Sequence, residues 1–141
     1  MKTLIMMVGL PRSGKSTLAK KESERLNAPI VCPDHIRLAM HGQPYVPSAE
    51  PLVWATTHLM VHALFMSYDT VILDACNNTK KRRNEWLNPK WRREFLIVDT
   101  PRTVCLERAG DNEGLRAAIG RMILQHEQVE KEEKSGQPSR Y

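Results

Sequence analysis

The chain lacks any apolar run that approaches the roughly 20 residues of a membrane span, and it is poor in cysteine. The first absence argues against a membrane protein, and we expect no membrane partner. The three cysteines are odd in number and lack the spacing of a metal site: Cys32, Cys76 and Cys105. Such usage is typical of a reducing cytoplasm, where a cysteine serves as a small buried hydrophobe. We therefore expect a cytoplasmic protein.

The sequence also contains no internal repeat and no sign of a second domain. Its 141 residues are enough for one domain that buries about two thirds of its unfolded surface. We expect a single domain over residues 1–134, followed by a flexible tail at 135–141.

A complete G-x-x-x-x-G-K-[ST] phosphate-binding loop is the most informative feature present. An apolar run precedes it and a helical pattern follows, so it stands in the strand–loop–helix order that the motif requires. The backbone N–H groups of such a loop cradle phosphates, Lys15 reaches the terminal phosphates, and the Ser16 hydroxyl binds Mg²⁺. A chance glycine turn is the alternative. We expect ATP and Mg²⁺ to bind through Gly9, Pro11, Arg12, Ser13, Gly14, Lys15, Ser16 and Thr17.

Strand and helix patterns alternate along the chain, which predicts an α/β fold with a parallel sheet. Apolar runs predict strands at 4–8, 30–32, 70–74 and 95–99. Helices are expected after the loop, at 34–40, 48–67 and 79–87, from 101, and from about 115 into 126–134. Ligands of such sheets bind outside the carboxyl ends of the strands, so the polar residues there are candidates for the site.

Asp34 and Arg37 follow the second predicted strand. A hydroxyl that attacks a phosphate needs a carboxylate to take its proton, and Asp34 is placed for that role. Arg37 lies three residues later on the same helical face, where it can hold a phosphate of the acceptor or pair with Asp34. The alternative is that Asp34 is an ordinary helix N-cap.

Asp74 follows the third predicted strand, the usual position of a carboxylate that binds Mg²⁺. Its alternative is a turn residue at the strand end. Asp99 follows the fourth strand, and there the sequence favours a helix-capping turn. We therefore place Ser16 and Asp74, but not Asp99, at the metal site.

A basic lid over the phosphates is expected near 108–116, where glycines are flanked by arginines. Arg108 is the candidate for stabilising the transferred group, Arg116 is the candidate for nucleotide binding, and Arg121 is a third. A plain loop between helices is the alternative reading.

The net charge of +5 is concentrated in two basic groups, Lys80–Arg83 and Lys90–Arg93, with Trp86 between them. Basic groups with an aromatic residue can bind phosphates and stack bases. The same pattern is also produced by an exposed helix with one solvated face, and this interpretation is slightly favoured.

These features together resemble the kinase domain of phage-type 5′-hydroxyl polynucleotide kinases and their P-loop relatives. The resemblance covers nearly the whole chain. Beyond the phosphate loop, it rests on Asp34-x-x-Arg37, on Asp74-Ala75-Cys76-Asn77-Asn78-Thr79 with Arg82 and Arg83, on Asp99-Thr100-Pro101, on 104–108 and on 119–122. It implies an adenylate-kinase-like P-loop fold, with a parallel sheet of four or five strands flanked by helices.

The resemblance also implies roles for single residues. Asp34 would be the general base for the 5′-hydroxyl, and Arg37 would contact the phosphate beside the acceptor nucleoside. Lys15 and a lid arginine would stabilise the transferred γ-phosphoryl group. The chain departs from the family pattern at Arg12, where glycine is common, at Cys76, where threonine is common, and at the acidic stretch 111–113 in the lid.

The sequence therefore predicts an ATP- and Mg²⁺-dependent phosphotransferase that acts on a hydroxyl, with a nucleic-acid 5′-end as the leading acceptor. A kinase of nucleosides, nucleotides or sugars would use the same loop, base and lid. A non-catalytic nucleotide-dependent interaction module is a third possibility, although it would not need Asp34, Arg37 and Asp74 together.

Overall fold

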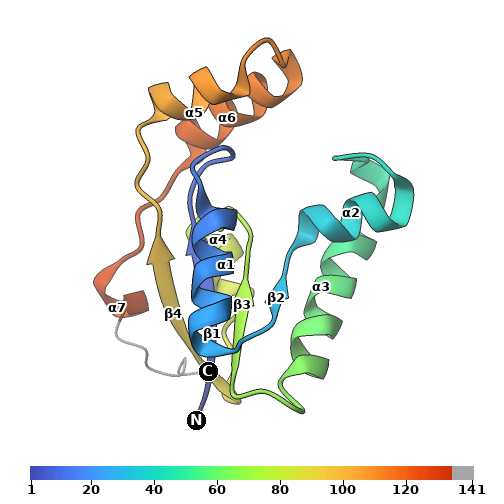
Figure 1. Cartoon of the computed structure of the whole chain (residues 1–141), viewed down its shortest axis with the longest axis vertical. Helices are drawn as coiled ribbons and strands as arrows, with labels where there is room; N and C mark the ends of the chain where they lie inside the picture. The colour runs from blue at the N-terminus through green and yellow to red at the C-terminus, as the bar shows by residue number, and fades with distance from the viewer. Residues whose placement is uncertain (135–141) are drawn as a thin grey trace.

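The computed structural model describes residues 1–134, and at its centre is a parallel four-stranded sheet in the order β2-β3-β1-β4 (Figure 1). The strands are β1 (Lys2–Val8), β2 (Ile30–Val31), β3 (Thr70–Leu73) and β4 (Trp91–Ile97). β1 is a central strand, with Leu4 in register with Val71 of β3 on one side and with Arg93 of β4 on the other. The predicted α/β fold is confirmed. The predicted flexible tail at 135–141 lies outside the described residues.

Helices connect the strands, as a parallel sheet requires. They are α1 (Lys15–Leu26), α2 (Pro33–His41), α3 (Glu50–Leu64), α4 (Lys80–Asn84), α5 (Arg102–Ala109), α6 (Glu113–Gln125) and α7 (Lys131–Lys134), with a 3₁₀ turn at Pro47–Ala49. None of the helices within residues 1–134 is both long and apolar enough to cross a membrane.

Both faces of β1 are covered, because successive strand residues point to opposite sides. Leu4 and Met6 lie in a buried cluster with Val53 of α3. Ile5 lies in a second cluster with Ala19 of α1. This double burial explains why β1 is a continuous apolar run in the sequence.

β4 begins at Trp91, whereas the sequence predicted a strand from Phe95. Trp91 and Arg93 are buried while Arg92 and Glu94 are exposed, so the strand has the expected alternation with an arginine in a buried position. The Arg93 guanidinium donates to the backbone carbonyl of Arg83 (2.7 Å). A buried arginine hides the strand pattern, because periodicity arguments treat it as a surface residue.

The predicted final helix is two separate elements, α6 and α7. Helical geometry ends at His126, and the backbone N–H of Glu127 donates to the carbonyl of Asn78 (3.0 Å) rather than continuing the helix.

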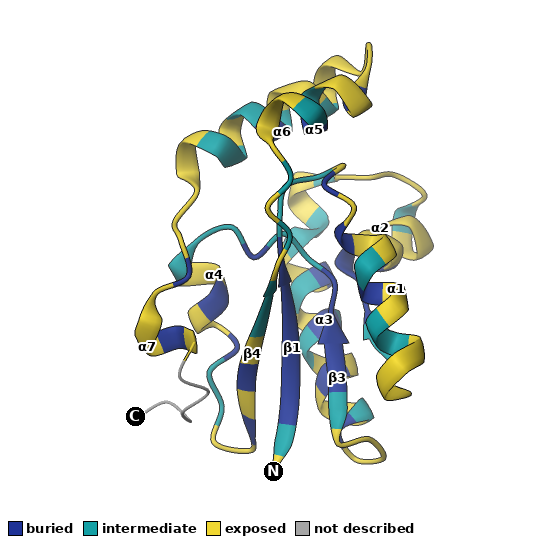
Figure 2. Cartoon of the chain, turned by 60° about the vertical axis from the view of Figure 1, so that its left-hand side comes forward, coloured by how far each residue is buried: buried dark blue, intermediate teal, exposed yellow. Residues whose placement is uncertain are grey.

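α5 and α6 form a helical pair above the carboxyl ends of the strands, over the loop that joins β1 to α1 (Figure 1). The pair has its own small core of Cys105, Ala109 and Ile119. Much of α6 is exposed, in contrast to the buried strand β1 (Figure 2). This arrangement places the predicted lid segment next to the phosphate loop.

Candidate active site

The phosphate loop has the backbone geometry that phosphate binding needs. Gly14 is the N-cap of α1 with φ of 93°, and Arg12 also has a positive φ of 65°. Gly9 is closely surrounded, since a Cβ there would lie 2.8 Å from Ser13 Oγ and 3.2 Å from the Val98 carbonyl. Within residues 1–134, no side chain caps the N-terminus of α1, which leaves its first N–H groups available to an anion.

Two residues outside the loop hold its backbone. The Thr100 hydroxyl donates to the Ser13 carbonyl (2.6 Å), and Arg108 Nη1 donates to the Arg12 carbonyl (3.1 Å). Thr100 follows β4 and Arg108 belongs to α5, so the loop is tied to the next strand and to the lid. The bond from Arg108 also explains how a non-glycine residue is held at positive φ at position 12.

Ser16 and Asp74, the predicted metal ligands, are in direct contact. The Ser16 hydroxyl donates to Asp74 Oδ2 (2.8 Å). The other carboxylate oxygen, Oδ1, is buried without a hydrogen-bond partner among the described residues. An unpaired buried carboxylate oxygen is costly, and a divalent cation with oxygen ligands would satisfy it. The hydroxyl and carboxylate therefore fit Mg²⁺. Lys15, the residue before Ser16, is buried.

Asp34 is not the N-cap of α2, as one interpretation of the sequence held. Cys32 is the N-cap, and Pro33 occupies the first turn, where its missing N–H costs nothing. Asp34 therefore lies in the first turn of α2 with its side chain 70% exposed. Its carboxylate is free to face an incoming molecule instead of capping the helix.

Arg37 forms the salt bridge to Asp34 that the sequence allowed, and a second one besides. Its Nη1 donates to Asp34 Oδ1 (2.6 Å), while its Nε and Nη2 donate to Glu50 (2.9 and 2.7 Å). Burial acts to lower the pKa of Arg37, but the bonds to Glu50 and Asp34 outweigh it and raise the pKa above its ordinary value. Glu50 begins α3 and had no signal in the sequence. The guanidinium, held by Glu50, thus fixes the position of the Asp34 carboxylate through one hydrogen bond.

Cys76 lies near three of the predicted site residues. Burial raises the pKa of its thiol, the charge of Lys15 opposes that rise, and the charges of Asp34 and Asp74 add to it. Lys15, Asp34 and Asp74 therefore all lie within electrostatic range of one sulfur atom. Cys76 therefore lies near the loop lysine and near the two carboxylates that the sequence assigned to metal binding and to the base.

The lid arginines differ in what they contact. Arg108 reaches the phosphate loop, as described above. Arg116 Nη1 donates instead to the carbonyls of Leu106 (2.7 Å) and Gly110 (3.4 Å), so it braces the turn between α5 and α6. Arg121 is exposed on α6. Of the three, Arg108 is the arginine that contacts the loop.

A family model described as an AAA domain matches residues 4–129, a span that includes every residue of this site. The chain belongs to this family. A comparison with curated proteins found no match.

Comparison with solved structures places the AAA domain among P-loop kinases in fold. One match is to the Pnkp1/Rnl/Hen1 complex, with a TM-score of 0.71, 25% identity, and coverage of 79% of this chain and 40% of that one. A second, to the Pnkp1/Rnl/Hen1 RNA repair complex, has a TM-score of 0.72, 21% identity, and coverage of 88% and 43%. The chain thus spans less than half the length of these two matches.

A gluconokinase from Sinorhizobium meliloti 1021 matches with a TM-score of 0.61 and 18% identity, covering 93% of this chain and 77% of that one. At that identity the likeness concerns the fold. The predicted resemblance to P-loop kinases, polynucleotide kinase-like proteins among them, is confirmed.

The basic stretch 80–93 of the AAA domain includes buried side chains, Arg83 and Trp86 among them. Arg83 is fully buried and pairs with Glu133 (2.9 Å), and its guanidinium also donates to the carbonyls of Asn77 and Gln128. Trp86 is buried as well, so it is not available to stack a base. The burial of Trp86 contradicts the alternative in which it stacks a base, and it agrees with the slightly favoured interpretation, in which the apolar residue packs inward and the exposed basic residues are solvated.

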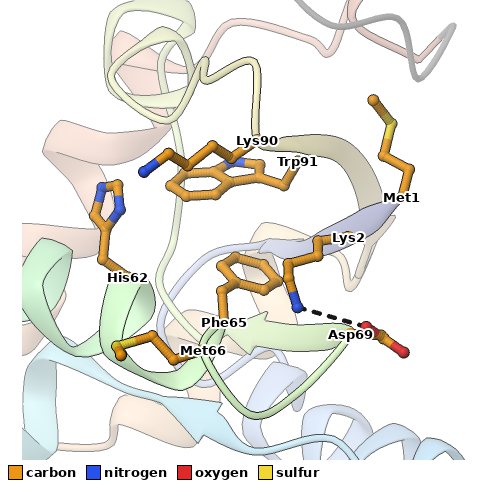
Figure 3. Close-up of a pocket in the computed structure, with 8 residues that line it drawn as sticks. All are labelled: Met1, Lys2, His62, Phe65, Met66, Asp69, Lys90 and Trp91. Carbon is orange, nitrogen blue, oxygen red and sulfur yellow. Dashed lines mark hydrogen bonds and ion pairs between the residues drawn. The ribbon is translucent and has the colours of Figure 1, made fainter.

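Two hollows flank the sheet at opposite ends. One, of about 250 Å³, lies beside the phosphate loop, and sequence reasoning missed it; its lining includes Gly9, Asn78, Val98, Thr100, Ile123 and His126. The other, of about 610 Å³, lies at the amino ends of the strands (Figure 3). Its lining includes Lys2, His62, Phe65, Asp69, Lys90 and Trp91. The smaller hollow is at the carboxyl ends of the strands, where ligands of such sheets bind, and it touches the start of the phosphate loop at Gly9. Its lining does not include Lys15, Asp34 or Asp74.

Proposed function

We propose that this chain is a kinase that transfers the γ-phosphoryl group of ATP, with Mg²⁺, to a hydroxyl, and that the acceptor is the 5′-hydroxyl of a polynucleotide. The observation that carries the proposal is the exposed carboxylate of Asp34, which Arg37 holds through a 2.6 Å bond at the start of α2. The charges of Asp34, Lys15 and Asp74 all act on the thiol of Cys76. A protein that only bound nucleotides would need the phosphate loop but no such carboxylate.

The nucleotide half of the site is built for a triphosphate. The N–H groups of the loop and the start of α1 bind phosphate oxygens, and Lys15 offsets the charge of the terminal phosphates. Ser16 and Asp74 would hold Mg²⁺, which would neutralise phosphate charge when bound. Arg108, which contacts the loop from α5, would stabilise the charge that develops on the group in transfer.

The acceptor half supplies the base. Asp34 takes the proton of the acceptor hydroxyl while the hydroxyl oxygen bonds to the γ-phosphorus. The bond between the γ-phosphorus and the β–γ bridging oxygen breaks in the same step. The products are a phosphomonoester and ADP. Arg37 keeps the carboxylate in one orientation, so that its lone pairs face the acceptor.

The proposal also covers the organisation and location of the chain. Residues 1–134 form one kinase domain with a lid at 108–116. The protein acts in the cytoplasm, where the cysteines Cys32, Cys76 and Cys105 stay free.

The polynucleotide acceptor is supported by the match to the Pnkp1/Rnl/Hen1 complex, the most identical of the three compared above. A small-molecule kinase is the second candidate. It is supported by the gluconokinase, which has lower identity but matches over more of its own length.

The experiment is transfer from γ-labelled ATP with Mg²⁺, offering 5′-hydroxyl DNA and RNA beside nucleosides, nucleotides and sugars. Label at the 5′-end of an oligonucleotide is the expected result. Label on a small molecule alone would overturn the acceptor and keep the reaction. ATP binding without transfer to any acceptor would favour the interaction module.

A further inference from the structure

The guanidinium of Arg82 lies over the ring of Trp54, an aromatic residue that also lies near Arg37. The guanidinium carbon of Arg82 is 4.5 Å from the centroid of Trp54, which links α4 to α3. Stacking of this kind holds the planar group by cation–π attraction and leaves its N–H edges free to bind an anion. The side chain of Arg82 is 45% exposed, so those edges are accessible.

Trp54 also connects Arg82 to the candidate base. The guanidinium carbon of Arg37 is 5.8 Å from the centroid of the same ring, and Arg37 bonds directly to Asp34. Arg82 is thus one aromatic ring away from the residue pair at which the acceptor hydroxyl would react.

The charge around Arg37 makes it a poor phosphate ligand. Its side chain is only 14% exposed, and its guanidinium lies between the carboxylates of Asp34 and Glu50, so these three groups together carry a net negative charge. A phosphate at Arg37 would have to approach two carboxylates. Among the residues that the structure describes, Arg82 pairs with the carboxylate of Glu85, at 3.4 Å with both partners exposed, which is a weak pair.

We propose that Arg82, held on Trp54, binds a backbone phosphate of the acceptor strand, and that Arg37 is a positioning residue for Asp34. This inference rests on the proposed polynucleotide acceptor and adds a selection rule to it. An acceptor that carries a phosphate beyond its reacting hydroxyl gains a charge-assisted bond, whereas a free nucleoside or sugar does not.

The test measures binding and transfer separately. Binding is the fluorescence anisotropy of a labelled single-stranded 5′-hydroxyl oligonucleotide at several salt concentrations. We expect Arg82→Ala to raise Kd about tenfold, the scale of one lost bond to a charged group. The slope of log Kd against log salt should fall by about 0.7, because one phosphate contact is lost. KM for ATP should not change.

Lys81→Ala is the matched control, because it removes the same charge from the next position of α4, where the side chain is exposed. It should change Kd much less than Arg82→Ala. Glu85→Gln should act in the opposite sense and tighten binding, since it removes the carboxylate that competes for Arg82. A purely structural role of Arg82 would not produce a gain of affinity. Thermal unfolding of each variant shows that the fold is kept.

The inference is wrong if Arg82→Ala binds the oligonucleotide with the Kd and salt slope of the Lys81→Ala control, or if the wild-type chain does not bind it. Its failure is distinguishable from failure of the proposed function. Transfer to oligonucleotides with no effect of Arg82→Ala overturns the inference alone. Binding that depends on Arg82 with no transfer overturns the proposed reaction alone.

Discussion

The hydroxyl of Ser16 and the carboxylate of Asp74 meet across 2.8 Å although they are 58 positions apart in the chain. Because Asp74 Oδ1 is buried and unpaired among the described residues, the pair presents a cation site of one hydroxyl and one carboxylate. We predict that Asp74→Asn raises the Mg²⁺ concentration needed for half-maximal transfer by tenfold or more, since an amide is a weaker cation ligand than a carboxylate.

A magnesium titration of transfer measures this effect. Asp69→Asn is the matched control. Asp69 immediately precedes β3, whereas Asp74 immediately follows it, and the side chain of Asp69 is 95% exposed. An unchanged magnesium requirement in Asp74→Asn would remove Asp74 from the metal site.

Gly9 and Gly120 make contrasting predictions for glycine-to-alanine changes. At Gly9 the new Cβ would clash with Ser13 Oγ at 2.8 Å and press on the Val98 carbonyl, so Gly9→Ala should distort the phosphate loop and weaken ATP binding by at least tenfold. At Gly120, within α6, a Cβ meets nothing within 4 Å. Gly120→Ala should leave ATP affinity unchanged and raise the free energy of unfolding by up to about 1 kcal/mol. Calorimetric ATP binding and denaturant unfolding measure the two effects, and equal ATP affinities in the two variants would contradict this account of the loop.

Arg108 and Arg116 should be separable by kinetics. Arg108→Ala removes the bond to the Arg12 carbonyl and the charge over the loop, so we expect kcat to fall by about two orders of magnitude. Arg116→Ala removes the brace between α5 and α6, so we expect mainly a lower melting temperature. Steady-state kinetics and thermal unfolding of both variants provide the measurement. A larger loss of kcat in Arg116→Ala would assign the lid role to Arg116.

The buried pair of Arg83 and Glu133 should make folding sensitive to acid. Burial acts to raise the pKa of Glu133, but its bonds to Arg83 and to the backbone of Glu130 outweigh this and lower the pKa below its ordinary value. A carboxyl whose pKa is lowered by folding stabilises the fold above its unfolded pKa of about 4.3. That stabilisation is lost as the pH falls through the lower pKa of the folded state.

Glu133→Gln should therefore destabilise the fold by about 3 kcal/mol at neutral pH, because Arg83 would keep its charge in a buried position. The difference from wild type should shrink below pH 4.3. Urea unfolding at a series of pH values measures it, with the exposed Glu127→Gln as the control. A difference that is constant with pH would show that the ion pair does not cause the loss.

The sequence was sufficient to predict the parts of the site that depend on local pattern. The phosphate loop has a fixed spacing, and the rule that ligands bind at the carboxyl ends of strands was enough to associate Asp74 with Ser16. Glu50 and the Arg82–Trp54 contact were not predictable, because each depends on how α3 packs against α2 and α4. The burial of Arg83 was not predictable either. A run of four basic residues indicates an exposed segment, and only the fold shows that Glu133 lies beside one of them.

The most direct test of the central claim is transfer by Asp34→Asn, measured in a single turnover with a 5′-hydroxyl oligonucleotide and paired with calorimetric ATP binding. The substitution keeps the size of the side chain and an oxygen that can accept the bond from Arg37, but it removes the proton acceptor. We predict that transfer is lost by at least two orders of magnitude while ATP affinity changes little. Transfer near the wild-type rate would contradict the assignment of Asp34 as the base.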